Sequence, residues 1–183
     1  MTGKPEVDRL RQQLDATFGR ARRLAGDAEL QSDFARYLCV LVSGFLEKAV
    51  FELLMEYVRK HSDKRVQPYM ERKLRRTTNL KRQRLLELFG AFDPAWGRDL
   101  DGFLVNEFKD AVDGIVDLRN GISHGGQEAV TMVRVDGYYK RIKVVVEHVS
   151  TLCLPEAAEA VIVTEAARPA TGAKASRKRG KKK

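Results

Sequence analysis

The chain has 183 residues, a net charge of +9, 43% hydrophobic and 32% charged residues, and only five prolines. This length suits one domain with a tail, and the composition is typical of a helix-rich globular protein. No apolar stretch reaches the roughly 18 residues that a membrane span needs, and the N-terminus shows no apolar signal segment. Two cysteines in apolar surroundings indicate buried free thiols, so we expect a cytoplasmic protein.

The first part of the chain predicts two long helices. A helix over about 5–24 has a proline near its first turn, where the missing N–H costs little, and ends at the Gly-Asp pair 26–27. A second helix begins at about 27 or 32 and can continue to 61. Its segment 37–46 is apolar over a wide arc, so we expect it to be the central and most buried helix.

Four further helices are predicted beyond this point. Two shorter ones cover about 65–76 and 80–90, and the Asp-Pro and glycines of 90–97 indicate a loop. Apolar residues spaced by four and three predict a helix over 104–122, and the same spacing predicts a last helix over 134–152. The expected fold class is all-α, an up-and-down helical bundle.

The positive charge falls in two separate places. Eight basic residues and no acid lie in 168–183, which leaves +1 for residues 1–167. We therefore expect a folded domain over 1–154 and a disordered Lys/Arg-rich tail over 155–183. Within the domain, residues 59–84 hold eleven Lys and Arg against two acids. This excess suits either a solvated helix face or an RNA-binding face, with the candidates Arg72, Lys73, Arg75, Arg76, Lys81 and Arg82.

One short motif carries side chains suited to phosphate chemistry. In Asp117-Leu-Arg-Asn-Gly-Ile-Ser-His-Gly-Gly126, a permanently charged Arg119 and a titratable His124 stand where an apolar-periodic helix reaches glycines. An arginine can hold phosphate oxygens and a histidine can move a proton, as RNA cleavage requires. On a regular helix the two would not share a face, whereas Asn120 and His124 would. The alternative is a helix end, with Gly125 as a left-handed cap.

Residues 37–47 and 117–125 together resemble the HEPN superfamily, and most closely its RiboL-PSP-HEPN branch. The resemblance implies an α-helical, two-fold dimeric endoribonuclease that needs no metal or other cofactor. It also implies that Arg119 and His124 are the catalytic pair and that Asn120 is the polar residue that follows the arginine. Glu47 either orients this pair or merely ends a buried stretch. Ser43, four residues earlier, either supports the site or forms a helix-packing notch.

The sequence thus predicts a homodimeric endoribonuclease acting on RNA, of the kind used as a toxin or defence effector, with a neutralising partner protein left open. Two alternatives remain: a non-catalytic HEPN-like interaction module, and a nucleic-acid-binding protein that uses the tail and residues 59–84. In an enzyme, Arg119 and His124 should be exposed in one shared cleft. In an interaction module, the hydrogen bonds of both side chains should be made locally, within one bundle.

Overall fold

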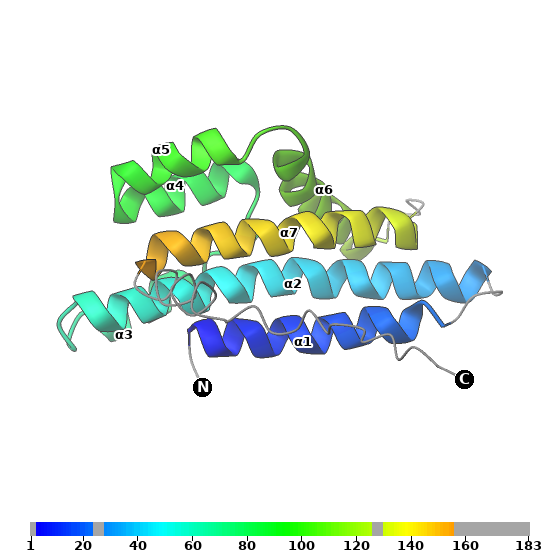
Figure 1. Ribbon diagram of the computed structural model, residues 1–183, viewed down its shortest axis with the longest axis horizontal. Helices are drawn as coiled ribbons and strands as arrows, with labels where there is room; N and C mark the ends of the chain where they lie inside the picture. Colours follow the sequence, from blue (N-terminus) through cyan, green and yellow to red (C-terminus); the bar gives the residue numbers. More distant parts are fainter. Residues whose placement is uncertain (1–2, 24–27, 126–129, 156–183) are drawn as a thin grey trace, which may run out of the picture.

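The computed structural model of the chain describes residues 3–23, 28–125 and 130–155, which form seven helices and no strand (Figure 1). The predicted all-α class is confirmed. The predicted tail over 155–183 lies, from residue 156 on, outside the described residues. The helices are α1 (Lys4–Ala21), α2 (Ala28–His61), α3 (Gln67–Arg75), α4 (Arg82–Phe92), α5 (Pro94–Phe103), α6 (Asn106–Ser123) and α7 (Met132–Cys153).

The long helix α2 is the centre of the bundle, as its wide apolar arc predicts. Leu38, Leu46 and Leu53 along it are completely buried, and α1, α3, α6 and α7 pack against it. Figure 1 shows α1, α2 and α7 side by side along the long axis of the molecule. Because burying one leucine contributes about 1.5–3 kcal/mol, this row of side chains holds the helices together.

Carboxylates of α2 fix the beginning of α1. The Gly3 N–H donates to Glu52 Oε2 at 3.3 Å, and the Lys4 N–H donates to Glu56 Oε2 at 2.9 Å. These backbone groups have no partner within their own helix, and negative charge is favourable at a helix N-terminus. The two bonds therefore hold α1 at a defined position along α2.

The prediction of a loop over 90–97 is wrong. Asp93 instead caps α5, because its Oδ1 accepts the Ala95 N–H at 2.7 Å and Pro94 occupies the first helical turn. The glycines serve packing, since a Cβ on Gly97 would lie 3.0 Å from the Cα of Gly90. Asp-Pro thus starts a helix here, and α4 and α5 form a close hairpin.

The predicted helix over 104–122 also needs correction at its start. Leu104 is a buried residue that ends α5, and α6 begins only at Asn106, whose φ is +46°. Cys39 and Cys153 are buried and neither is in a disulfide, which confirms the expected thiols, and the Cys39 thiol donates to the Ile115 carbonyl oxygen at 3.8 Å. None of the described helices combines the length and apolar character needed to cross a bilayer.

Candidate active site

Helix α6 carries the Arg-Asn-x-x-x-His motif to its very end. It continues without a break through Gly121 to Ser123. His124 is the C-cap, and its N–H donates to Asn120 O at 3.1 Å. Gly125 follows with φ +75°, a conformation that glycine adopts without a steric cost. His124 therefore lies directly after the last residue of α6, and its side chain is exposed there.

The guanidinium of Arg119 is held on two sides. Its Nη2 donates to Glu47 Oε1 at 3.0 Å, and its Nη1 donates to the side-chain Oδ1 of Asn120 at 3.0 Å. The Arg119 and Glu47 side chains are 24% and 23% exposed, so water reaches this ion pair only partly. A guanidinium has five N–H donors, and the two bonds leave others available for a phosphate. Arg119 is thus held in position and still has N–H groups that can donate to a phosphate.

Glu47 connects three parts of the chain. The oxygen that accepts from Arg119 on α6 also accepts the backbone N–H of Asn79 at 2.8 Å. Asn79 lies between α3 and α4 with φ +55°, a left-handed conformation that asparagine tolerates better than most residues. Of the two expectations for Glu47, the geometry favours the orienting one, since the carboxylate fixes both Arg119 and the α3–α4 connection.

Ser43 and His124 stand apart from this network. The Ser43 hydroxyl is buried and has no hydrogen-bonding partner among the described residues. The His124 side chain is exposed, and its ring forms no hydrogen bond with any described residue. The structure therefore joins Arg119, Asn120 and Glu47, whereas the exposed ring of His124 is not part of this network of described residues.

The six basic candidates divide into two sets. Lys81 pairs with Asp117 on α6 at 2.5 Å, and this hydrogen bond raises the pKa of Lys81. The Arg82 backbone N–H donates to Asp113 at 2.7 Å, and its side chain bonds to the Leu104 carbonyl and to Asp101. These two residues tie the start of α4 to its neighbours.

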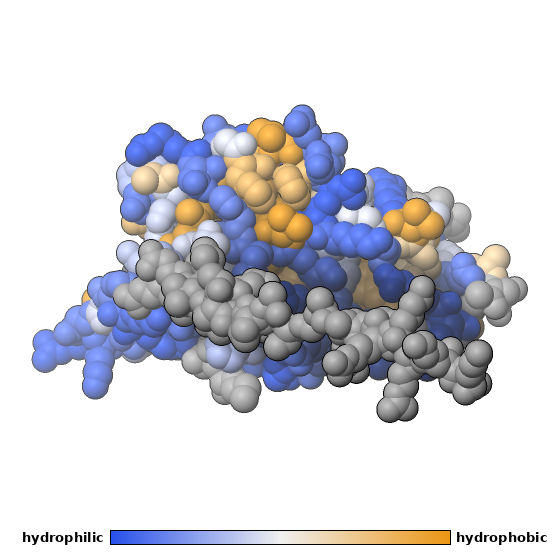
Figure 2. Space-filling model, in the orientation of Figure 1, coloured by the Kyte–Doolittle hydropathy of each residue, from blue (hydrophilic) through white to orange (hydrophobic). Residues whose placement is uncertain are grey.

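The remaining four candidates belong to α3. Figure 2 shows that α3 is mostly hydrophilic on the face in view. The four side chains are exposed, and Arg75 pairs with Glu71 one turn earlier at 2.6 Å. They are Arg72, Lys73, Arg75 and Arg76. The α3 set therefore stays available to a polyanion.

Sequence reasoning missed Asn79 and the Lys81–Asp117 pair. The signal available was the Thr-Thr-Asn run at 77–79 between two basic helical segments, because asparagine is enriched where a chain turns through the left-handed region. Within the described ranges, no three His, Cys, Asp or Glu side chains are grouped so that they could hold a metal ion.

Comparison with known proteins identifies one family for most of the chain. The family model of RiboL-PSP-HEPN matches residues 8–154, which contain both α2 with Glu47 and the motif at the end of α6. No curated protein and no solved structure matches the chain significantly. The family suggests a HEPN-type, RNA-related function. The chain belongs to the RiboL-PSP-HEPN family.

Proposed function

We propose that this protein is a metal-independent endoribonuclease whose Arg119 and His124 form a catalytic site shared between two copies of the chain. One observation carries the proposal: Arg119 is fixed by Glu47 and Asn120, while His124 is exposed at the adjoining helix end with no described partner. A positioned cation and an exposed imidazole at the end of the same helix are groups that phosphodiester cleavage can use. Family membership supports the same assignment.

The chemistry follows from these two side chains. A neutral His124 accepts the proton of the ribose 2′-hydroxyl, whose oxygen forms a bond to phosphorus while the bond from phosphorus to the 5′-oxygen breaks. Arg119 binds the non-bridging oxygens through parallel hydrogen bonds and stabilises their additional charge. A second imidazole, His124 of the partner subunit, gives a proton to the departing 5′-oxygen. The products are a 2′,3′-cyclic phosphate and a free 5′-hydroxyl.

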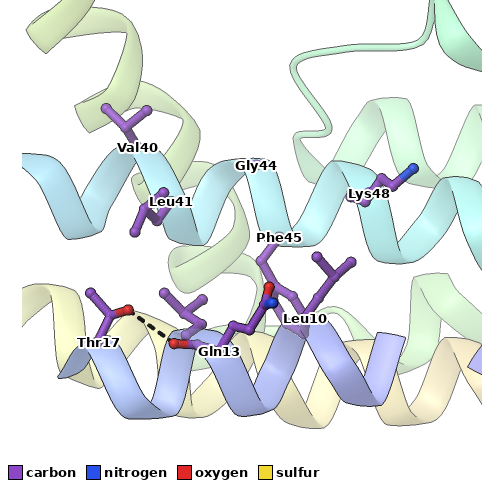
Figure 3. A pocket seen from close by; sticks show the side chains of 9 residues that line it. Leu10, Gln13, Thr17, Val40, Leu41, Gly44, Phe45 and Lys48 are labelled. Carbon is purple, nitrogen blue, oxygen red and sulfur yellow. Dashed lines mark hydrogen bonds between the residues drawn. The ribbon is translucent and has the colours of Figure 1, made fainter. Parts of the chain in front are cut away.

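An apolar groove between α1 and α2 supplies a surface for the second copy. Figure 3 shows Leu41 and Phe45 of α2 pointing toward α1, where Leu10 lines the other side of the groove. The groove encloses about 560 Å³, and Val40 remains 42% exposed. A Cβ on Gly44 would meet nothing within 4 Å, so a partner side chain has room to approach there. Glu47, which accepts from Arg119, follows Gly44 about one turn later on the same helix.

The local satisfaction of Arg119 favours one other function, that of a non-catalytic interaction module. In that case the Arg119–Glu47 pair would only join α6 to α2. The role of toxin or defence effector, with or without a neutralising partner, belongs to the proposed ribonuclease and rests on the family alone.

End-group analysis of the RNA products tests this proposal. The protein is incubated with a labelled single-stranded RNA in the presence of a chelator, beside an RNA of the same sequence that is fully 2′-O-methylated. We expect 2′,3′-cyclic phosphate ends from the first RNA and no cleavage of the second, because methylation removes the attacking hydroxyl. Cleavage of both RNAs, or 5′-phosphate products, would contradict the mechanism, and no cleavage of either would favour the interaction module.

A mixing experiment tests the shared site. Arg119→Ala and His124→Ala chains are inactive alone if each site needs both groups. We expect the mixture to recover part of the cleavage rate if the two copies supply groups to one cleft. A mixture as inactive as its components would leave each site within one chain.

A further inference from the structure

Glu47, which accepts from Arg119, also lines a second cavity. This cavity encloses about 410 Å³ between α2, α3 and the residues that follow α3, which is within the roughly 300–1,000 Å³ of typical small-molecule sites. The lining residues that matter here are Glu47, Lys48, Phe51, Arg75, Thr77 and Thr78. The cavity and Arg119 therefore share one carboxylate as a common wall.

Two cations lie over one aromatic ring in this cavity. The Lys48 Nζ is 5.1 Å and the Arg75 guanidinium carbon is 4.9 Å from the centroid of the Phe51 ring. Each cation also has a carboxylate on its own helix, with Lys48 at 2.8 Å from Glu52 and Arg75 at 2.6 Å from Glu71. The Arg75–Glu71 pair is largely exposed and contributes little, so turning Arg75 toward a phosphate costs little. Glu52 is only 7% exposed, so Lys48 keeps this pair and offers a phosphate its remaining N–H donors.

The hydroxyl groups of the cavity add polar contacts beside these cations. Thr77 donates its hydroxyl proton to the Lys73 carbonyl, which leaves its oxygen lone pairs as acceptors. Thr78 is exposed in the same connection, one residue before Asn79. Cations, an aromatic ring and hydroxyls in one concave site match a nucleotide, which combines a phosphate, a flat base and a hydroxylated sugar.

Further basic side chains on α3 lie outside this cavity. A smaller cavity of about 180 Å³ on α3 is lined by Tyr69, Arg72, Lys73 and Arg76, and Tyr69 is 59% exposed. Aromatic side chains alternating with cations along a groove are typical of proteins that bind single-stranded nucleic acid. A strand that leaves the larger cavity along α3 would therefore meet further cations and an exposed aromatic ring.

We propose that the Lys48–Arg75 cavity binds one nucleotide of a single-stranded RNA, the neighbour of the phosphodiester that Arg119 holds. This inference rests on the proposed ribonuclease function, whose site it extends. Lys48 and Arg75 bind the phosphate of that nucleotide, and Thr78 contacts its sugar or base. The protein then selects single-stranded RNA, because a base that is paired within a double helix cannot turn away from its partner to contact the cavity.

Direct binding tests the cavity independently of cleavage. The probe is a short, fluorescently labelled, single-stranded 2′-O-methyl RNA that the wild-type protein cannot cleave. Lys48→Gln and Arg75→Gln should each weaken binding about three- to tenfold and should each make the slope of log affinity against log salt shallower by about 0.7. Lys60→Gln is the matched control, because Lys60 lies on the same helix, pairs with Glu56 at i,i+4 and is similarly exposed.

A variant that fills the cavity without changing any charge provides a second test. Thr78→Trp places a large side chain at an exposed position of the lining and should raise the KM for a cleavable single-stranded RNA about tenfold, with kcat at saturating RNA nearly unchanged. Wild-type binding and wild-type salt slopes in both charge variants would overturn the proposal. So would an effect of Lys48→Gln on oligomeric state alone, since that result would make the cavity part of a protein interface. If the probe binds as expected but no RNA is ever cleaved, the cavity assignment holds and the proposed ribonuclease fails.

Discussion

Replacing Glu47 by glutamine tests whether this residue positions Arg119. The variant keeps the shape of the side chain and an acceptor for the Asn79 N–H, but removes the negative charge that faces Arg119 at 3.0 Å. A hydrogen bond to a charged group contributes about 1.5–3 kcal/mol and a neutral one about 0.5–1.5 kcal/mol. With two bonds on one oxygen, the free energy of unfolding should fall by about 1–3 kcal/mol.

The effect on catalysis should appear in kcat. One positioned donor to a developing negative charge is worth about 10²–10³-fold in kcat, and a disoriented Arg119 should lose about 10- to 100-fold of it. KM should change little, because the cations on α3 still bind the RNA. Single-turnover and steady-state cleavage assays separate these quantities.

Glu71→Gln is the control for this experiment. It removes a similar carboxylate from a pair whose side chains are 60% and 40% exposed, which should cost no more than about 1 kcal/mol and leave kcat unaffected. A Glu47→Gln enzyme with wild-type kcat and stability would refute the argument that Glu47 orients Arg119. Equal losses of kcat in both variants would assign the effect to general electrostatics.

Three further perturbations test the fold around the site. Gly97→Ala should lower the free energy of unfolding in urea by about 1–3 kcal/mol, because the new Cβ would lie 3.0 Å from the backbone of α4. Gly102→Ala is the control, since its Cβ would lie in open space, and equal effects of the two substitutions would contradict the close packing of α4 and α5. Ser43→Ala should leave the free energy of unfolding unchanged or higher, since the buried hydroxyl has no described partner, and a loss above about 1 kcal/mol would reveal a missing bond. Burial raises the pKa of the Cys153 thiol to about 12, so this thiol should react with a thiol reagent at pH 8 only after the protein unfolds, and rapid labelling of the native protein would contradict its burial. The raised pKa stabilises the folded state fully at pH values below the pKa of the unfolded thiol, and this stabilisation should be lost as the pH rises toward 12.

The sequence predicts the long helices well and the hairpin badly. The apolar arc of α2 and the stripe of α6 follow from side-chain spacing, which depends only on helical geometry. In 90–97, Asp-Pro and the glycines suit both a loop and a capped, closely packed helix start. Only the contact between Gly90 and Gly97 decides between these, and it depends on how α4 and α5 meet.

The residues of the site also differ in how far they could be predicted from the sequence. Arg119, Asn120 and His124 stand out in the sequence because their chemistry and spacing are local. Glu47 is a candidate from its place in the resemblance, but its contact with Arg119 spans 72 residues and requires the fold. The bond from the Asn79 N–H could not be predicted, since every residue except proline offers the same backbone donor.

The rate of RNA cleavage by His124→Ala, measured beside the wild type with a chelator present, tests the central claim most directly. General acid–base catalysis contributes about 10²–10⁴-fold, so the variant should cleave at least about 100-fold more slowly while its far-ultraviolet circular dichroism shows the same helix content. The wild type should cleave equally well with and without the chelator. Undiminished cleavage by His124→Ala, or complete loss of wild-type cleavage in the chelator, would contradict the account.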